Sequence, residues 1–349
     1  MNLRAGLPTC GVASVILAPV KQVQPDPEDF MPKRQMVLDV DVGIDDAVMM
    51  MAIAAEPDAE IVAIGSAHGN CSAAVAAQNA LKVLETIGLE HIPVALGAES
   101  PLDPPHSAPQ VHGHDGLADI GLPAPRGRVT GESAVDQLLR LSLERPGELD
   151  LIAVATMTNL GLALERDPAV LSRFRTVAIL GAFARQPQPG DPVAFDANIA
   201  GSPSAAEQLF AADAPLVVVP IDTTRYSVLT PEHIERIRTS TTPQGKLAWQ
   251  ILPHYFNFYQ HRLDGVWSAR MHDPLVPAVL LDPTLITASE RKPFYVEPWE
   301  GAWRAVGRSG DALAGREPRP AAEVITAVDQ SRFLDRFVDA LTLPLGTLT

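Results

Sequence analysis

The chain has 349 residues, of which 46% are hydrophobic, so it can bury a sizeable core in one large domain or two. Its formal net charge of −15 argues against nucleic acid or an anionic membrane as the main partner. No apolar run reaches the ~18 residues needed to cross a bilayer. The two cysteines, Cys10 and Cys71, exclude a disulfide framework and favour a reducing, cytoplasmic compartment.

The N-terminal region differs from the rest of the chain. Arg4 and the apolar stretch 11–20 faintly resemble a signal peptide, but the residues that follow form a poor cleavage site and then a polar, Pro-rich segment. We expect residues 1–34 to be a disordered extension, or translation to start at Met31. A single folded domain over residues 35–345 follows.

Strand-like and helix-like segments then alternate along the chain. Apolar runs predict strands over residues 36–38, 61–64, 93–96, 149–155, 177–180 and 216–219, and helices over 47–55, 73–87 and 133–143. A Pro- and His-rich loop is expected over 99–125. Continuous apolar strands that alternate with helices predict an α/β, Rossmann-like fold with a mostly parallel central sheet flanked by helices. We see no repeat and no clear linker between domains.

Four aspartates lie within eight residues after the first predicted strand: Asp39, Asp41, Asp45 and Asp46. Gly43 supplies the tight turn into the following helix. Carboxylates this crowded repel one another and are costly to desolvate unless a cation offsets them. A hard divalent ion is the simplest candidate. In the alternative, Asp45 and Asp46 only cap the helix, which does not account for all four.

Polar residues also follow the other predicted strands. Asp41, Gly69-Asn70, Thr158 and Gly181 each come just after the carboxyl end of a strand. Active sites of parallel α/β sheets form at this edge. The pattern therefore predicts one site that collects these residues.

Five short motifs are spread along the chain. They are Asp-Val-Asp-Val-Gly-Ile-Asp-Asp-Ala at 39–47, Gly-Asn at 69–70, His-Gly-His-Asp-Gly at 112–116, Thr-Asn at 158–159 and His-Asp-Pro-Leu at 272–275. In this order they resemble the inosine–uridine-preferring nucleoside hydrolase family, whose opening motif has Pro where Val42 stands. Each motif is weak alone, but the combination over residues 35–340 is specific.

The resemblance implies an enzyme that hydrolyses the N-glycosidic bond of ribonucleosides to ribose and free base, with Ca²⁺ as its cofactor. Transferred by position, the calcium ligands are Asp41, Asp46, the main-chain carbonyl of Thr158, and Asp273. An oxygen-only set suits calcium better than magnesium. Asp41 would also be the general base that takes a proton from the attacking water. The transition state is expected to resemble an oxocarbenium ion.

The resemblance also places residues around the substrate. Four of them are expected to hold the ribose: Asp45, Asn70, Asp196 and Asn198. His272 is the expected proton donor or hydrogen-bond partner of the leaving base, and its alternative is a structural histidine at a helix start. His112 is a second candidate for the base, or else a solvated loop histidine.

Tyr255 and Tyr259 are spaced four residues apart, so they share one face of a predicted helix. They form either a wall that stacks on the nucleobase or an aromatic face packed on the core. Departures from the family lie nearby. The family's Glu-Phe-Asn is Asp196-Ala197-Asn198 here, and its Gly-Asn is Gly190-Asp191, so the preference for base or sugar is left open.

Three other functions compete with this interpretation. A phosphatase of the haloacid dehalogenase type also uses Asp-x-Asp after a first strand, but residues 42–46 do not fit its motif. A non-catalytic, calcium-dependent nucleoside binder on the same scaffold is the second, since fold does not fix function. A hydrolase of another N-riboside is the third. Family members are typically dimers or tetramers, so the resemblance implies a homodimer or homotetramer with a small nucleoside as its partner.

Overall fold

The computed structural model describes residues 33–101, 107–186, 196–299 and 301–348. The predicted N-terminal extension lies outside these residues except at its end, and the folded part described here begins at Lys33. The domain boundaries therefore stay a prediction. Within the described residues, no helix is long and apolar enough to cross a membrane.

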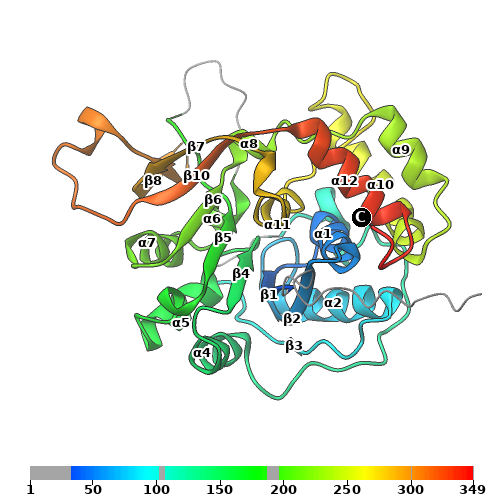
Figure 1. The fold of residues 1–349 in the computed structure, drawn as a ribbon, viewed down its shortest axis with the longest axis horizontal. Helices are drawn as coiled ribbons and strands as arrows, with labels where there is room; N and C mark the ends of the chain where they lie inside the picture. Colours follow the sequence, from blue (N-terminus) through cyan, green and yellow to red (C-terminus); the bar gives the residue numbers. More distant parts are fainter. Residues whose placement is uncertain (1–32, 102–106, 187–195, 300, 349) are drawn as a thin grey trace, which may run out of the picture. The chain divides into compact units, whose positions relative to one another are not determined.

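An eight-stranded sheet organises the fold in the order β3-β2-β1-β4-β5-β6-β10-β7 (Figure 1). Its strands are β1 Arg34–Val40, β2 Ala59–Ser66, β3 Val94–Ala95, β4 Leu149–Ala153, β5 Thr176–Leu180, β6 Leu216–Val219, β7 Ile286–Lys292 and β10 Ala322–Val328. All neighbours pair in parallel except β10 and β7, which pair antiparallel. The prediction of a mostly parallel sheet is confirmed.

Helices cover both faces of this sheet (Figure 1). The longer ones are α1 Ile44–Ala55, α2 Ala73–Ile87, α4 Ala134–Glu144, α5 Thr158–Arg166, α7 Pro203–Ala211, α9 Pro231–Arg238, α10 Pro243–Gln260, α11 Leu275–Leu281 and α12 Gln330–Thr342. Short helical segments are α3 Pro109–His112, α6 Ala197–Gly201, α8 Ile221–Thr224, η2 Leu171–Arg173, η3 Pro283–Leu285 and η4 Gly310–Leu313. A separate hairpin pairs β8 Phe294–Trp299 with β9 Ala302–Gly307.

The sequence of β1 shows why the sheet is buried on both faces. Met36, Leu38 and Val40 pack in the core with α1 and α10, whereas Val37 packs in the second core with α4 and α5. Successive side chains of a strand point to opposite faces, so a continuous apolar run fills both cores. The predicted strands and helices are confirmed to within a few residues.

One predicted loop is more ordered than expected. The segment 99–125 contains the short helix α3, which contacts α10 and brings His112 against the start of α1. The pattern of prolines and histidines gave no sign of it, because a helix of four residues is too short to show periodicity.

Candidate active site

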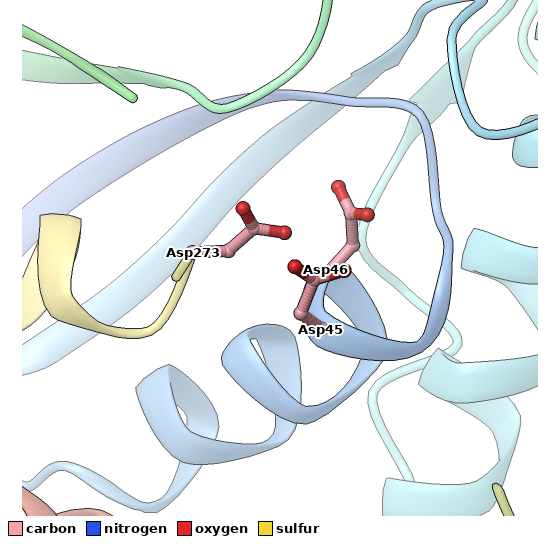
Figure 2. Close-up of side chains that lie close together, drawn as sticks. All are labelled: Asp45, Asp46 and Asp273. Atoms are coloured by element: carbon pink, nitrogen blue, oxygen red, sulfur yellow. The ribbon is translucent and has the colours of Figure 1, made fainter. Parts of the chain in front are cut away.

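Acidic side chains gather at the carboxyl edge of the central strands. Asp41 follows β1, Asp45 and Asp46 lie in the first turn of α1, and Asp273 precedes α11. Asp45, Asp46 and Asp273 point toward one another, and their ligand atoms all lie within 4.8 Å of one another (Figure 2). The fold thus brings residues some 230 positions apart in the sequence into one cluster. The carboxyl-edge argument predicts the position of Asp41, whereas Asp273 was predicted from the family resemblance alone.

Asn70 connects Asp41 to this cluster. The backbone N–H of Asn70 donates to Asp41 Oδ2 at 2.8 Å, and its side-chain Nδ2 donates to Asp41 Oδ1 and Asp46 Oδ2, each at 3.1 Å. The adjacent Gly69 allows this approach, because a Cβ atom there would lie 1.8 Å from Asp41 Oδ2. Asn70 therefore fixes Asp41 beside the three other carboxylates.

The carboxylates share one electrostatic problem. Burial raises the pKa of Asp41 and of Asp273 well above the usual range, and the neighbouring aspartates raise both further. Burial and the charge of Asp45 raise the pKa of Asp46 to about 7. These groups cannot all stay ionised in a buried site without a compensating cation.

The alternative that Asp45 and Asp46 only cap the helix accounts for one carboxylate oxygen, Oδ2 of Asp46. Its Oδ2 accepts from the Gly43 N–H at 2.9 Å, as a residue near a helix start often does. Its Oδ1 and Oδ1 of Asp45 are buried and have no hydrogen-bond partner among the described residues. Unsatisfied carboxylate oxygens beside a third carboxylate fit a hard divalent ion, whose preferred ligands they are.

His272 lies between two hydroxyl groups. Its Nδ1 is 2.6 Å from Thr224 Oγ1, and its Nε2 is 3.0 Å from the hydroxyl of Tyr259. Burial lowers the pKa of His272 to about 4, although Asp45 opposes that change. The ring is therefore neutral near pH 7, and each nitrogen has a partner that can donate or accept a proton.

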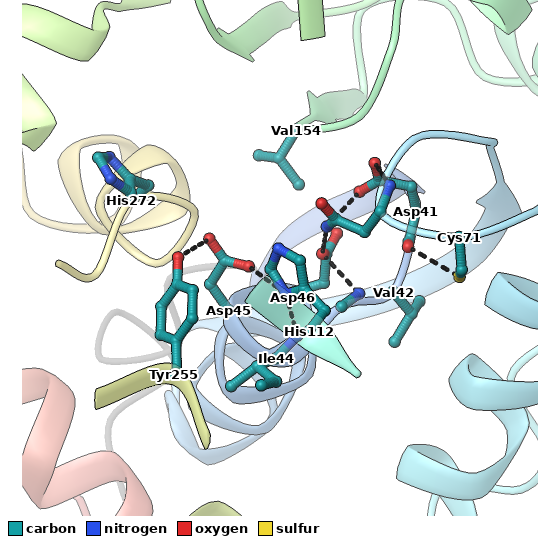
Figure 3. Close-up of polar contacts among 12 residues, drawn as sticks. Asp41, Val42, Ile44, Asp45, Asp46, Cys71, His112, Val154, Tyr255 and His272 are labelled. Carbon is teal, nitrogen blue, oxygen red and sulfur yellow. Dashed lines mark hydrogen bonds and ion pairs between the residues drawn. The ribbon is translucent and has the colours of Figure 1, made fainter. Parts of the chain in front are cut away.

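Tyr255 and Tyr259 do share a face of α10, as their spacing predicts, and both are buried. Their rings contact each other edge to face at 4.9 Å. The hydroxyl of Tyr255 donates to Asp45 Oδ2 at 2.9 Å (Figure 3). These rings pack in the core, as the second alternative predicts, and their hydroxyls reach the acidic cluster and His272. A wall that stacks on the nucleobase stays a prediction.

His112 is buried, so its interpretation as a solvated loop histidine is wrong. Because α3 folds over the start of α1, the Ile44 N–H donates to His112 Nδ1 at 3.1 Å. In the neutral ring this leaves the proton on Nε2. Asp45 Oδ1 lies 3.8 Å from the same Nδ1, too far for a hydrogen bond.

Asp196 and Asn198 are largely engaged with backbone groups. The Asp196 carboxylate accepts from Ala182 N–H at 2.6 Å and caps α6 through Ile199 N–H at 3.2 Å. Asn198 Nδ2 donates to the carbonyls of Val154 and Leu180. These contacts place Asn198 at the carboxyl ends of β4 and β5, and its contact with the ribose stays a prediction. Gly190-Asp191 lies outside the described residues.

Some buried residues of the site were not predicted. His68 Nε2 lies 2.7 Å from Thr158 Oγ1 and 3.0 Å from Thr156 Oγ1, so this histidine supports the turn that carries Thr158. Asn159 Nδ2 donates to Asp39 Oδ1 at 2.7 Å, which gives the first aspartate of the cluster a structural partner. His68 directly precedes Gly69-Asn70, and this position was the available signal.

Comparison with known proteins identifies this arrangement. The family model described as inosine-uridine preferring nucleoside hydrolase matches residues 36–335. The chain belongs to this family. Uridine nucleosidase 1 of Arabidopsis thaliana is 32% identical over 72% of the chain and 75% of its own length. The inosine-uridine preferring nucleoside hydrolase of Leishmania major is 29% identical over 88% of the chain and 97% of its own length.

Solved structures agree with the assignment. A plant nucleoside hydrolase superposes with a TM-score of 0.82 at 27% identity and covers 90% of this chain and 100% of its own. A purine-preferring ribonucleoside hydrolase from Gardnerella vaginalis gives 0.79 at 25% identity, covering 88% and 98%. The prediction of an N-ribosyl hydrolase is confirmed, and the acidic cluster of this nucleoside hydrolase is a site that could bind a metal.

Proposed function

We propose that this nucleoside hydrolase cleaves ribonucleosides, with uridine the first to test, through Asp41 as general base and a calcium ion at the acidic cluster. The observation that carries the proposal is the convergence of Asp45, Asp46 and Asp273, with Asp41 tied to Asp46 through Asn70. Several of its relatives are named uridine nucleosidases. The cellular location and a homodimeric or homotetrameric state remain predictions.

The donor set fits a calcium ion. Asp41, Asp46, Asp273 and the main-chain carbonyl of Thr158 would hold it, and all of them are oxygen ligands. When bound, such an ion lowers the pKa of a neighbouring water and offsets the charge of the carboxylates. Because the ligand atoms of Asp45 lie within 4.8 Å of those of Asp46 and Asp273, Asp45 is a further candidate ligand, in addition to its proposed contact with the ribose.

The reaction then follows from the residues themselves. The oxygen of a water forms a bond to C1′ of the ribose while the bond from C1′ to the base nitrogen breaks. The water gives its proton to the Asp41 carboxylate, which the backbone N–H and side-chain amide of Asn70 hold in position. The electron pair of the broken bond passes to the base nitrogen. The carboxylates stabilise the positive charge that develops on the sugar.

His272 and its two hydroxyl partners are placed to protonate the departing base. The chain from Thr224 Oγ1 through the imidazole to the Tyr259 hydroxyl is continuous at 2.6 and 3.0 Å. The imidazole or the Tyr259 hydroxyl can therefore donate a proton or a hydrogen bond to the departing base. Asp45, Asn70 and Asn198 are proposed to hold the ribose, and His112 and Tyr255 to border the base. Asp196 caps α6, the helix that carries Asn198, and so is proposed to support the ribose side of the site.

The first test is release of ribose from inosine, adenosine, guanosine, uridine, cytidine and nitrophenyl riboside, with calcium and after chelation. We expect calcium-dependent release from at least one nucleoside. Asp41→Ala should lower kcat at least about 1,000-fold with the fold intact, because it removes the base and a ligand. Tight binding of nucleosides without turnover in any condition would instead support a non-catalytic binder.

The role of His272 has its own test. His272→Ala should lower kcat for uridine about 100-fold or more, because a poor leaving group needs a proton. Nitrophenyl riboside, whose leaving group departs without one, should lose less than about tenfold. The ratio of the two rates separates this role from a structural one. Equal losses on both substrates would show that His272 does not assist the leaving group.

A further inference from the structure

Arg270 lies beside Tyr259 and His272 and has no charged partner among the described residues. Its Cζ is 5.7 Å from the centre of the Tyr259 ring, and the hydroxyl of that ring contacts His272. A backbone bridge to Val228 fixes its position two residues before His272. Among the described residues, no carboxylate lies within ion-pair distance of its guanidinium, and its buried Nε has no hydrogen-bond partner.

This isolation is unexpected in an acidic chain. The sequence has 42 acidic residues against 27 lysines and arginines, and among the described residues most other half-buried arginines pair with carboxylates, for example Arg336 with Glu56 and Arg319 with Glu207. Leaving a half-buried cation unpaired costs free energy. A guanidinium also presents a planar fork of donors that suits an anionic group such as a carboxylate. An anionic ligand would supply the missing partner.

The reaction itself generates such an anion. When the bond from C1′ to the base nitrogen breaks, the electron pair stays on the base, so a neutral base is anionic until it is protonated. In a pyridinium riboside, the electron pair of the broken bond neutralises the positive ring nitrogen. If that ring also bears a carboxylate, the departing base is therefore an anion. A fixed cation beside Tyr259 and His272 stabilises either species.

We propose that Arg270 is a specificity-determining residue that favours N-ribosides whose base carries a negative charge, or acquires one as the glycosidic bond breaks. The inference rests on the proposed function, which places the leaving base against Tyr259 and His272. It names the class of substrate that the site prefers. Pyrimidine nucleosides and ribosides of carboxylated rings belong to this class, and ribosides of cationic bases that leave as neutral molecules do not.

Nicotinic acid riboside and nicotinamide riboside form a matched pair, because they differ only in a carboxylate against a carboxamide. We would measure kcat/KM for both and for uridine with the wild type, Arg270→Gln and Arg270→Lys. Arg270→Gln should lower kcat/KM about tenfold for nicotinic acid riboside and uridine, as the loss of one nearby charge predicts, and less than about twofold for nicotinamide riboside. Arg270→Lys should retain most of the preference.

Arg262→Gln is the control for net charge. The Arg262 guanidinium is exposed, stacks 3.9 Å from the centre of the Phe258 ring and donates to the Phe258 carbonyl, so its loss should leave the ratio of the two ribosides unchanged. Equal losses on all substrates in Arg270→Gln would overturn the proposal, because they would show that Arg270 only packs on Tyr259.

Hydrolysis of any riboside by the wild type decides the proposed function separately. If the wild type hydrolyses none, calorimetric binding of the two nicotinate-type ribosides still tests Arg270. Tighter binding of nicotinic acid riboside that disappears in Arg270→Gln would support the proposal. Equal binding of both ribosides by the wild type, or no binding of either, would overturn it.

Discussion

At the scale of single residues, the position of Asp41 depends on the absence of a side chain at residue 69. A Cβ on Gly69 would lie 1.8 Å from Asp41 Oδ2 and 2.8 Å from its Cγ. The Asp41 carboxylate would have to move, and it would lose the hydrogen bond from Asn70 N–H. A displacement of about 1 Å at a reacting group typically costs about 100-fold in rate.

We therefore predict that Gly69→Ala lowers kcat for uridine at least about 100-fold. Gly131→Ala is the matched control, because a Cβ at Gly131 meets no atom within 4 Å. Steady-state kinetics of both variants, with thermal unfolding to confirm the fold, provide the measurement. Near wild-type activity in Gly69→Ala would show that the carboxylate does not need its observed position.

Which single residues could be predicted depended on how their contacts arise. The acidic cluster around Asp41, Asp45 and Asp46 could be predicted, because these residues are close in the sequence and follow a strand at the carboxyl edge of a parallel sheet. The burial of His112 was not, because it follows from α3 folding onto the start of α1. Nor was the engagement of Asp196 with Ala182 N–H. Both contacts join segments whose approach no local pattern encodes.

At the scale of elements, the carboxylates at the two ends of the central strands have opposite surroundings. At the carboxyl edge, Asp41, Asp46 and Asp273 have no arginine or lysine partner among the described residues and could bind a cation. Near the other end, Asp150 in β4 accepts from Arg34 Nε at the start of β1 and from Arg175 Nε before β5, each at 2.9 Å. One carboxylate thus ties the starts of three adjacent strands together. Such clamps between elements were not visible in the sequence, although the strands themselves were.

Asp150→Asn should therefore lower the free energy of unfolding by about 2–3 kcal/mol at pH 7. Removing one member of a buried ion pair costs about 3–5 kcal/mol. The side chains of Arg34 and Arg175 are 29% and 37% exposed, so water screens part of their interaction with Asp150 and the expected loss is smaller. Denaturant unfolding measures the difference. Asp213→Asn, at an exposed position, should change stability by less than about 0.5 kcal/mol.

The pH dependence of this clamp has a definite sign. Burial alone would raise the pKa of Asp150, but the hydrogen bonds and charges of Arg175 and Arg34 outweigh it and hold the pKa below the usual value. Because the pKa of Asp150 is lower in the folded state, its ionised carboxylate stabilises the folded state above the unfolded pKa of about 3.9. This stabilisation is lost as the pH falls through the folded-state pKa. The stability gap between wild type and Asp150→Asn should narrow below about pH 4. A gap that is constant down to pH 2 would rule out an ionic role for Asp150.

At the scale of the whole molecule, the net charge of −15 and a buried acidic site act in the same direction, since both oppose the compact state in the absence of cations. A divalent ion that binds only the folded chain stabilises it by an amount set by its concentration relative to its Kd. If the proposed ion binds at Asp41, Asp45, Asp46 and Asp273, stability and catalysis are coupled through the same four carboxylates.

This coupling predicts a response to calcium that needs no substrate. Calcium at 100 times its Kd should stabilise the wild type by about 2.7 kcal/mol, which raises the Tm by several degrees. Asp46→Asn and Asp273→Asn should each reduce the calcium-dependent rise in Tm, while their metal-free Tm values stay equal to or above that of the wild type because a repelling charge is gone.

Asp58→Asn is the control, because it removes the same charge at an exposed position and should leave the rise in Tm unchanged. Differential scanning calorimetry, with chelator and with added calcium or magnesium, measures all four proteins. A rise that persists in both site variants would place the ion elsewhere, and an equal rise with magnesium would contradict the choice of calcium, since magnesium demands a tighter octahedral set.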